Sequence, residues 1–262
     1  MNKKTILITG AASGIGRETA LFFAKQGWFT GLFDVNEDGL KAAASEIGGE
    51  NCISLRMDVT DPESVQQGMA AFALKTGGRM DVLLNNAGIL TFGLFENIPL
   101  ETHLRIVDVN FKGGLTVIHC AIPFLKQTPG ARIINMSSAS SIYGVPDLSV
   151  YSATKHALSA MTEALNIEME RHGIFVCDIR PPYVKTPLLN SPVTVHSIRM
   201  MGVHLGPDKV AKAVWKAAHV KKPHWDISAT WLLNAFFHIM PFAGRFLVKA
   251  LAMPSKKMFN GI

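Results

Sequence analysis

Residues 5–16 read Thr-Ile-Leu-Ile-Thr-Gly-Ala-Ala-Ser-Gly-Ile-Gly, an apolar run that ends in a turn with three glycines. The run has the length and composition of a buried β-strand, and an amphipathic segment of helical length begins at residue 15. Glycines let the backbone turn sharply and let its N–H groups approach a phosphate at a helix N-terminus. The stretch therefore predicts a strand, a turn and a helix that bind a dinucleotide, with a turn that binds nothing as the alternative.

The rest of the chain repeats this alternation of strand and helix. Further apolar runs of strand length occur at 29–34, 52–58, 82–85, 132–136, 174–179 and 225–228, and segments of helical length at 15–26, 38–47, 62–76, 100–126, 150–172 and 207–219. Continuous apolar strands separated by helices are typical of parallel strands that are buried on both faces. We therefore expect an α/β fold with a doubly wound parallel sheet of the Rossmann type.

The length of the chain and its charge distribution define the expected domain organisation. The 262 residues, 48% of them hydrophobic, suffice for one large domain, which we place at 1–228 with a substrate loop at 187–206. Residues 229–262 are expected to form a basic, apolar helical extension of it. The net charge of +6 is localised, because residues 209–262 hold nine Lys and Arg and one acidic residue. A localised charge beside apolar residues does not indicate nucleic-acid binding.

Cysteine and histidine usage predicts a reducing compartment and no metal centre. Cys52, Cys120 and Cys177 are widely spaced, and we interpret them as reduced, buried residues. No signal peptide precedes the first strand, so a cytoplasmic location is the default expectation. The histidines at 103, 119, 156, 172, 204 and 224 have no metal-ligand spacing either, so no metal site is predicted.

An acidic residue after the second strand bears on the choice of dinucleotide. Asp34 lies twenty residues beyond Gly14, where a carboxylate accepts hydrogen bonds from a ribose and repels a 2′-phosphate. Neither Ser13 nor Val35 is basic, which favours NAD over NADP, although Arg17 is close enough in sequence to modify this preference. Asp58 and Val59 follow the third strand and are expected beside the adenine, with a helix N-cap as the alternative role for Asp58.

Several motifs occur in the order found in a known family. They are Thr9-Gly10-xxx-Gly14-x-Gly16, Asn85-Asn86-Ala87-Gly88, Asn110, Ser138 and Tyr151-xxx-Lys155. Over residues 3–220 the chain thus resembles the short-chain dehydrogenase/reductase family, in its short single-domain branch. The resemblance implies hydride transfer between a nicotinamide cofactor and an alcohol or carbonyl substrate. It also implies a homodimer or homotetramer that pairs through the helices at 100–126 and 150–172.

The chemistry of the proposed catalytic group follows from its residue types. Tyr151 and Lys155 are four residues apart on an expected helix, so their side chains share one face. A phenol with a pKa near ~10 is a poor base at neutral pH, and a nearby ammonium stabilises its phenolate. The resemblance implies that Tyr151 transfers the proton, that Ser138 binds the substrate oxygen and that Lys155 also holds the nicotinamide ribose. It further implies that Asn110 binds a water in a proton relay.

The predicted cofactor contacts combine the glycine turn with the family motifs. They are Gly10, Ser13, Gly14, Ile15, Gly16, Asp34, Asp58, Val59, Asn86, Ala87, Gly88, Tyr151, Lys155, Pro181, Val184 and Thr186. The chain departs from the family at Pro182, which stands where a glycine is usual. Proline fixes φ and removes an N–H donor, so we expect a stiffer hinge there.

The end of the chain is the second departure from the family. Residues 231–253 are apolar, and Pro241 divides them into two segments too short to span a bilayer. The tail is expected to pack over the substrate pocket or a second subunit, or to contact a membrane surface peripherally through residues 229–257. Each arrangement favours a lipophilic substrate, as do the apolar residues Leu90, Ile142, Val145, Leu148, Tyr183, Leu188, Met200 and Met201.

Taken together, the sequence predicts an NAD-dependent oxidoreductase for a lipophilic secondary alcohol and its ketone, or a primary alcohol and its aldehyde. The alternatives are an NADPH-dependent carbonyl or 3-oxoacyl thioester reductase and a non-catalytic nucleotide-sensing or scaffold protein. Asp34 argues against the first alternative. The full set Asn110, Ser138, Tyr151 and Lys155 argues against the second, because a pure binding protein has no chemical use for an activated phenol.

Overall fold

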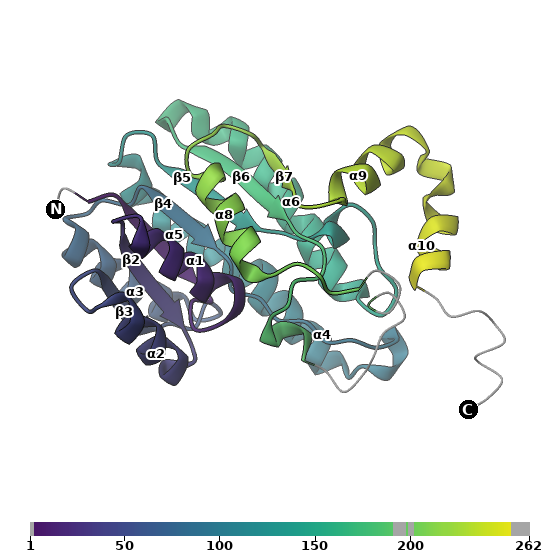
Figure 1. Cartoon of the computed structure of the whole chain (residues 1–262), viewed down its shortest axis with the longest axis horizontal. Helices are drawn as coiled ribbons and strands as arrows, with labels where there is room; N and C mark the ends of the chain where they lie inside the picture. The colour runs from purple at the N-terminus through teal and green to yellow at the C-terminus, as the bar shows by residue number, and fades with distance from the viewer. Residues whose placement is uncertain (1–2, 191–197, 199–201, 253–262) are drawn as a thin grey trace.

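The computed structural model describes residues 3–190, 198 and 202–252, and a seven-stranded parallel sheet forms its centre (Figure 1). The strand order is β3-β2-β1-β4-β5-β6-β7. The strands are β1 (Thr5–Thr9), β2 (Phe29–Asp34), β3 (Cys52–Arg56), β4 (Val82–Asn85), β5 (Arg132–Met136), β6 (Phe175–Arg180) and β7 (His224–Asp226). The predicted doubly wound parallel sheet is confirmed.

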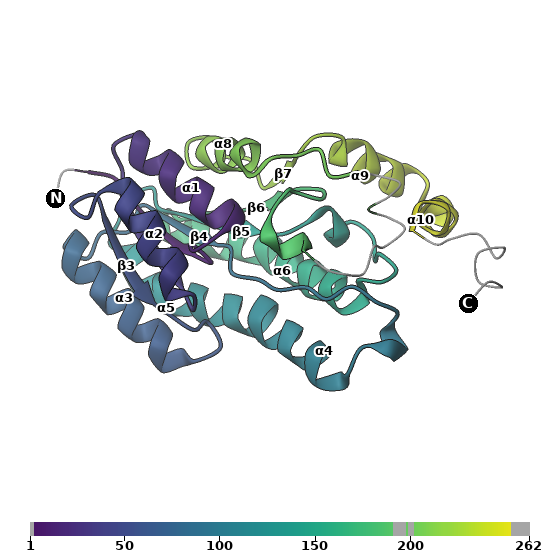
Figure 2. The same ribbon diagram turned by 60° about the horizontal axis from the view of Figure 1, so that its bottom comes forward.

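Helices cover both faces of this sheet (Figure 2). The α-helices of the body are α1 (Gly14–Lys25), α2 (Glu37–Ile47), α3 (Pro62–Thr76), α4 (Leu100–Val107), α5 (Gly114–Lys126), α6 (Ser149–Glu168) and α8 (Pro207–Ala217). Side chains of β1 alternate between two hydrophobic clusters: Ile6 and Ile8 pack with α1, α2 and α8, whereas Leu7 packs with α3 and α5. Because both faces of each inner strand are buried, nearly every position on it must be apolar.

The boundaries of the elements follow local signals where these exist. Asp61 caps α3 by accepting a hydrogen bond from the Glu63 N–H at 3.0 Å, and Pro62 occupies the first turn. Asp58 is therefore not the N-cap of this helix. The predicted strand at 52–58 ends at Arg56, and the strand at 225–228 is shifted to His224–Asp226.

The helix predicted at 100–126 is interrupted. A π-helical turn, Asp108–Gly113, separates α4 from α5 and carries Asn110. The predicted helix at 150–172 likewise ends in a 3₁₀ turn, Met169–His172. Hydrophobic periodicity does not distinguish a π turn from a regular helix, and such turns occur most often at functional sites. The deviation thus points to the region around Asn110.

The chain reverses its winding direction between β1 and β4, which are neighbours in the sheet. Loops that follow these two strands, residues 10–13 and 86–88, therefore meet at the carboxyl edge of the sheet. In open parallel sheets ligands bind at such a switch point. At the other end of the sheet β7 leads into α9 (Thr230–Ile239), a 3₁₀ turn at Pro241–Ala243 and α10 (Gly244–Ala252). This confirms that Pro241 lies between two short helical segments.

Candidate active site

A cavity of about 500 Å³ lies at the carboxyl edge of the sheet and gathers nearly all of the predicted site residues. Those on its wall are Gly10, Ser13, Gly14, Ile15, Asp34, Asp58, Val59, Asn86, Ala87, Gly88, Ser138, Tyr151, Lys155, Pro181, Val184 and Thr186. Gly16 and Asn110 are absent from the wall. Both lie directly behind it, where they hold residues that line the cavity.

The glycine turn brings three stretches of backbone unusually close together. Gly10 and Gly14 have φ angles of +68° and +54°, a left-handed conformation that L side chains rarely adopt. A Cβ atom on Gly16 would collide with the Gly10 carbonyl oxygen. The Asn86 side chain donates to the carbonyls of Thr9 at 2.9 Å and Gly10 at 3.2 Å, which ties the loop after β4 to this turn. The result is a side-chain-free cradle at the N-terminus of α1, as a pyrophosphate requires.

Asp34 is fixed beside this cradle. One carboxylate oxygen accepts a hydrogen bond from the Ala12 N–H at 3.1 Å, and the other accepts one from the Asn36 N–H at 3.0 Å. Arg17 lies on α1, but its guanidinium is paired with Glu46 of α2 at 2.5 Å. Asp34 therefore places a negative charge beside the turn, while the positive charge of Arg17 is paired with Glu46.

Asp58 forms a second acidic position at the same end of the cavity. Its carboxylate accepts hydrogen bonds from the Thr60 hydroxyl at 2.7 Å and the Thr60 N–H at 2.9 Å, and lies 3.8 Å from Arg105. Burial acts to raise its pKa, but these hydrogen bonds and the charges of Arg105 and Arg56 hold the pKa below its usual value. Arg105 also lines the cavity, a position that its place in the middle of a helical segment did not predict.

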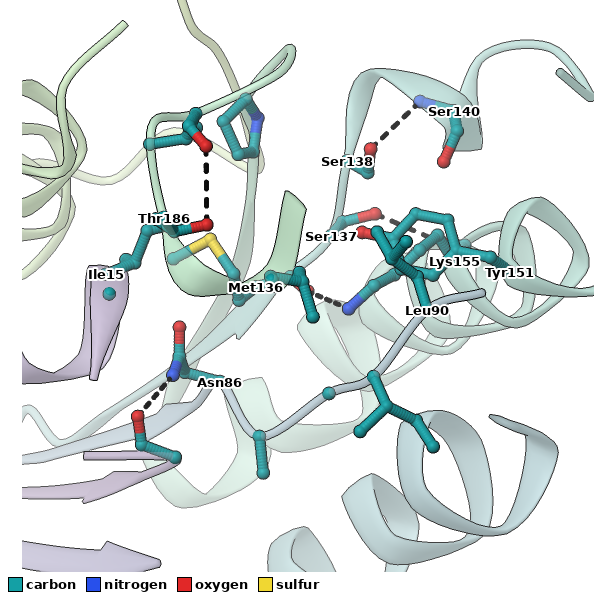
Figure 3. Close-up of a pocket in the computed structure, with 18 of the residues that line it drawn as sticks. Ile15, Asn86, Leu90, Met136, Ser137, Ser138, Ser140, Tyr151, Lys155 and Thr186 are labelled. Atoms are coloured by element: carbon teal, nitrogen blue, oxygen red, sulfur yellow. Dashed lines mark hydrogen bonds between the residues drawn. The ribbon is translucent and has the colours of Figure 1, made fainter. Parts of the chain in front are cut away.

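Tyr151 and Ser138 face each other across the opposite end of the cavity (Figure 3). Ser138 lies two residues after the end of β5, and its backbone is extended. Its hydroxyl accepts a hydrogen bond from the Ser140 N–H at 3.2 Å. Burial raises the pKa of the Tyr151 phenol to about 12, while a hydrogen bond with the Ser138 side chain acts in the opposite direction. The phenol is thus protonated at neutral pH, and a positive charge near it favours the phenolate.

Lys155 supplies such a charge from the next turn of α6. Its ammonium donates to the Met136 carbonyl at 2.7 Å and lies 5.6 Å from the centre of the Tyr151 ring (Figure 3). The side chain is only 4% exposed, and burial lowers its pKa to about 8. The ammonium is therefore still charged at pH 7, and it is surrounded mostly by protein atoms.

Asn110 braces the wall behind this pair. Its side-chain oxygen accepts a hydrogen bond from the Ile89 N–H at 2.8 Å, and its amide donates to the Ile89 carbonyl at 2.9 Å and the Thr154 hydroxyl at 3.3 Å. A Cβ atom on Gly88 would lie 3.3 Å from the Asn110 oxygen and 3.6 Å from the Lys155 ammonium. Asn110 and Lys155 thus both lie next to Gly88, although they are far apart in sequence.

The remaining part of the wall is apolar. Of the residues predicted to favour a lipophilic substrate, those on the wall are Leu90, Val145, Leu148, Tyr183 and Leu188. Ile142 lines a separate hollow instead, next to His156. Met200 and Met201 of the predicted substrate loop lie outside the described residues. Pro182 also lines the cavity, between Pro181 and Tyr183.

The C-terminal helices complete this apolar wall. Leu233 and Phe237 of α9 and Val248 of α10 line the cavity. The Phe237 ring stacks on Tyr143, with ring centres 4.9 Å apart and planes inclined by 18°. A Cβ atom on Gly244 would approach Phe237 to 2.8 Å and Tyr143 to 3.0 Å, so α10 begins in close contact with both rings. Of the expected positions for the tail, packing over the pocket is the one that these contacts support.

Comparisons with known proteins agree with this geometry. The family model described as short chain dehydrogenase matches residues 4–194. The chain is 32% identical to a cyclohexanol dehydrogenase of Acinetobacter sp. (strain SE19) over 222 residues, which covers 81% of this chain and 86% of that protein. It is 31% identical to a 3-oxoacyl-[acyl-carrier-protein] reductase of Thermotoga maritima over 218 residues, covering 80% and 88% of the two chains.

A solved structure is similar along most of its length. The 3-ketoacyl-(acyl-carrier-protein) reductase from Brucella melitensis, complexed with NADH, superposes with a TM-score of 0.78 at 31% identity. The match covers 86% of this chain and 96% of that one.

Proposed function

Because this chain belongs to the short-chain dehydrogenase/reductase family and is an oxidoreductase acting on CH–OH groups, we propose that it is NAD-dependent and that its substrate is lipophilic. The proposed reaction interconverts a secondary alcohol and its ketone, or a primary alcohol and its aldehyde. The observation that carries the proposal is the position of Tyr151 in the cavity. Tyr151 lines the same cavity as Phe237 and the other apolar wall residues, and the charged Lys155 lies 5.6 Å from the centre of its ring.

In the proposed mechanism each catalytic side chain has one task. Tyr151 takes the hydroxyl proton of the alcohol during oxidation and returns it during reduction. Ser138 holds the substrate oxygen beside the phenol, and Lys155 stabilises the phenolate with its ammonium. Asn110, whose side chain is held by the backbone of Ile89, binds a water that links Lys155 to solvent as a proton relay. The bound nicotinamide supplies the hydride acceptor or donor.

The residues present fit a nicotinamide dinucleotide. The cradle of Gly10, Gly14 and Gly16 would be filled by any Cβ, so its N–H groups remain accessible to a pyrophosphate. Asp34 is held by two backbone N–H groups beside it, in position for ribose hydroxyls. Lys155 and Gly88 lie at the other end, where the nicotinamide half would be held.

Asp34 should determine the preference between NAD and NADP. At an effective dielectric constant of ~20, two unit charges ~4 Å apart repel by about 4 kcal/mol, before screening by salt. We therefore expect kcat/KM for NAD to exceed that for NADP on the order of 100-fold, and Asp34→Ser to remove most of this ratio. Steady-state kinetics with both cofactors measures it. Asp38→Ser, which removes an exposed carboxylate of α2, should leave the ratio unchanged.

The same kinetics test the alternative of an NADPH-dependent reductase. Similarity to 3-oxoacyl reductases supports the substrate class of this alternative, whereas the solved structure of one of them is complexed with NADH. Preferential reduction of a 3-oxoacyl thioester with NADPH would replace the proposed activity with this one. A screen for NADH formation with small and lipophilic alcohols should instead find turnover that increases with the apolar area of the alcohol.

Phe237 should set the preference for lipophilic alcohols. Burial of an aromatic side chain against a ligand contributes about 1.5–3 kcal/mol, so Phe237→Ala should lower kcat/KM for a bulky alcohol roughly tenfold or more. Turnover of a small alcohol that does not reach this wall should change less than about threefold. Phe246→Ala, in which an exposed ring is removed from α10, is the matched control. Equal losses for both alcohols would argue against a role of Phe237 in substrate recognition.

The cellular setting is part of the proposal. We place the protein in a reducing compartment such as the cytoplasm, because Cys52, Cys120 and Cys177 are all free. We also propose a homodimer or homotetramer that pairs through α4, α5 and α6, since Leu100, Leu104 and Leu115 are exposed there. Light scattering of the purified protein measures the assembly.

A further inference from the structure

The C-terminal helix pair, residues 230–252, has an inner and an outer face. It comprises α9, the 3₁₀ turn and α10, and it lies at the end of the molecule opposite β2 and β3 (Figures 1 and 2). The inner face reaches the cavity through Leu233, Phe237 and Val248. The pair is therefore both a wall of the proposed substrate site and a surface of the protein.

The outer face is apolar and exposed. Trp231 is 57% exposed, Phe242 75% and Phe246 74%, and Leu232, Ile239 and Met240 are exposed on the same short segment. Single exposed apolar residues are common on protein surfaces, but a group of this size on two adjoining helices marks an interaction site. The aromatic residues in it are those that prefer the boundary between water and the interior of a membrane.

Positive charge lies on the same helix pair. Arg245 and Lys249 of α10 are exposed, and residues 209–262 contain nine Lys and Arg in all. The only acidic residue of this stretch, Asp226, is partly buried and accepts a hydrogen bond from Asn234 at 3.2 Å. The rest of the chain, residues 1–208, has a slight excess of acidic residues. An occupant of the outer face must therefore be both apolar and anionic.

We propose that the outer face of the C-terminal helix pair docks on an anionic lipid bilayer, from which the cavity takes its substrate. Amphipathic helices with basic and aromatic residues bind such surfaces by burying the apolar face near the headgroups. A second copy of the chain fits less well, because symmetric pairing through this face would bring Arg245 and Lys249 of both copies together. The part of the inference that concerns substrate entry rests on the proposed function, whereas docking itself does not.

Docking is tested by flotation of the full chain with vesicles. The wild type should float with phosphatidylcholine vesicles that contain phosphatidylserine, less so at high salt, and should stay at the bottom with pure phosphatidylcholine. Replacing both Arg245 and Lys249 by glutamine should weaken binding roughly 30-fold, since each basic residue contributes about fivefold. Trp231→Ser combined with Phe242→Ser and Phe246→Ser should abolish it.

A matched control removes the same kinds of side chain from the opposite end of the molecule. Leu74 and Lys75 of α3 are both exposed, and Leu74→Ser with Lys75→Gln should leave flotation unchanged. Circular dichroism melting curves identify any variant that does not fold, in which case single substitutions are used. Absence of wild-type flotation at low salt would overturn the proposal. The proposal would also be overturned if the triple variant lost an oligomer but still floated like the wild type. A second copy of the chain would then be the occupant of the outer face.

Substrate entry is tested separately with an alcohol dissolved in the vesicles and one dissolved in water. Anionic vesicles should raise the rate with the lipid-dissolved alcohol, and the Arg245/Lys249 double variant should lose this gain while it keeps its rate with the soluble one. Flotation without oxidation of either alcohol would refute the proposed function and leave docking intact. Oxidation of both alcohols without flotation would refute docking and leave the proposed function intact.

Discussion

Tyr151→Phe should lower kcat for alcohol oxidation by about 10²–10⁴-fold while NADH binding changes less than about twofold. The substitution keeps the ring, which is buried with Leu148, Phe92 and Ile106, and removes only the hydroxyl. Because the phenol is the proposed acid and base, this change removes the group that exchanges a proton with the substrate oxygen. The loss should therefore occur in the chemical step, and it should affect oxidation and reduction alike.

Stopped-flow kinetics and fluorescence titration with NADH separate the two effects. Tyr143→Phe is a matched control, because it removes a phenol from the same cavity but retains the ring that stacks on Phe237. We expect this control to lose less than about fivefold in kcat. A Tyr151→Phe enzyme with near-normal turnover would show that the proton moves by another route.

Lys155→Met should lower the rate of alcohol oxidation at pH 7 by about 100-fold and shift its pH dependence upward. The ammonium lies 5.6 Å from the centre of the Tyr151 ring. As a general estimate, a unit positive charge ~6 Å from a phenolate oxygen stabilises it by about 3 kcal/mol at an effective dielectric constant of ~20, which lowers the pKa of the phenol by roughly two pH units. Removing the charge raises that pKa, so less phenolate is present at any given pH.

The sign of the pH dependence follows from the same two groups. Burial raises the pKa of Tyr151 to about 12, so the phenolate fraction rises about tenfold per pH unit below that value. In the wild type Lys155, with a pKa near 8, is charged at pH 7 and supports the phenolate there. Oxidation should accordingly increase with pH in both proteins. The curve of Lys155→Met should be displaced to higher pH below about pH 8, and the two curves should converge above it, where Lys155 loses its proton.

A pH profile of kcat/KM from pH 6 to 10 measures this displacement. Lys155→Arg is the matched variant, because it retains the positive charge but changes the group that donates to the Met136 carbonyl. It should recover part of the rate at pH 7 and most of the wild-type profile. Identical profiles for the wild type and Lys155→Met would mean that the lysine acts only in binding.

Local signals predicted much of the candidate site. The glycines at positions 10, 14 and 16 are required wherever a turn must bring backbone close to a phosphate, and the structure gives Gly10 and Gly14 the left-handed φ angles of such a turn. Tyr151 and Lys155 share a helix face because of their spacing alone. In each case the relevant geometry extends over a few residues, so the sequence contains all the information needed.

Other parts of the site depend on contacts that have no local signal. Asn110 occupies a π turn because it bonds to Ile89 and Thr154, and the apolar pattern around it is that of an ordinary helix. Arg105 reaches the cavity only because α4 lies beside the loop after β3. A prediction from periodicity alone places both residues on one regular helix and misses these roles.

The sequence by itself determined the parallel sheet, the glycine turn and the shared helix face of Tyr151 and Lys155, because the hydrophobic pattern of the strands, turn geometry and helix spacing are local properties of the chain. The tertiary structure decided where the apolar tail lies. Phe237 stacks on Tyr143 and Gly244 fits against both rings, although these residues are distant in sequence. An apolar helix can pack on any complementary surface, so only the shape of the folded domain selects which one it covers.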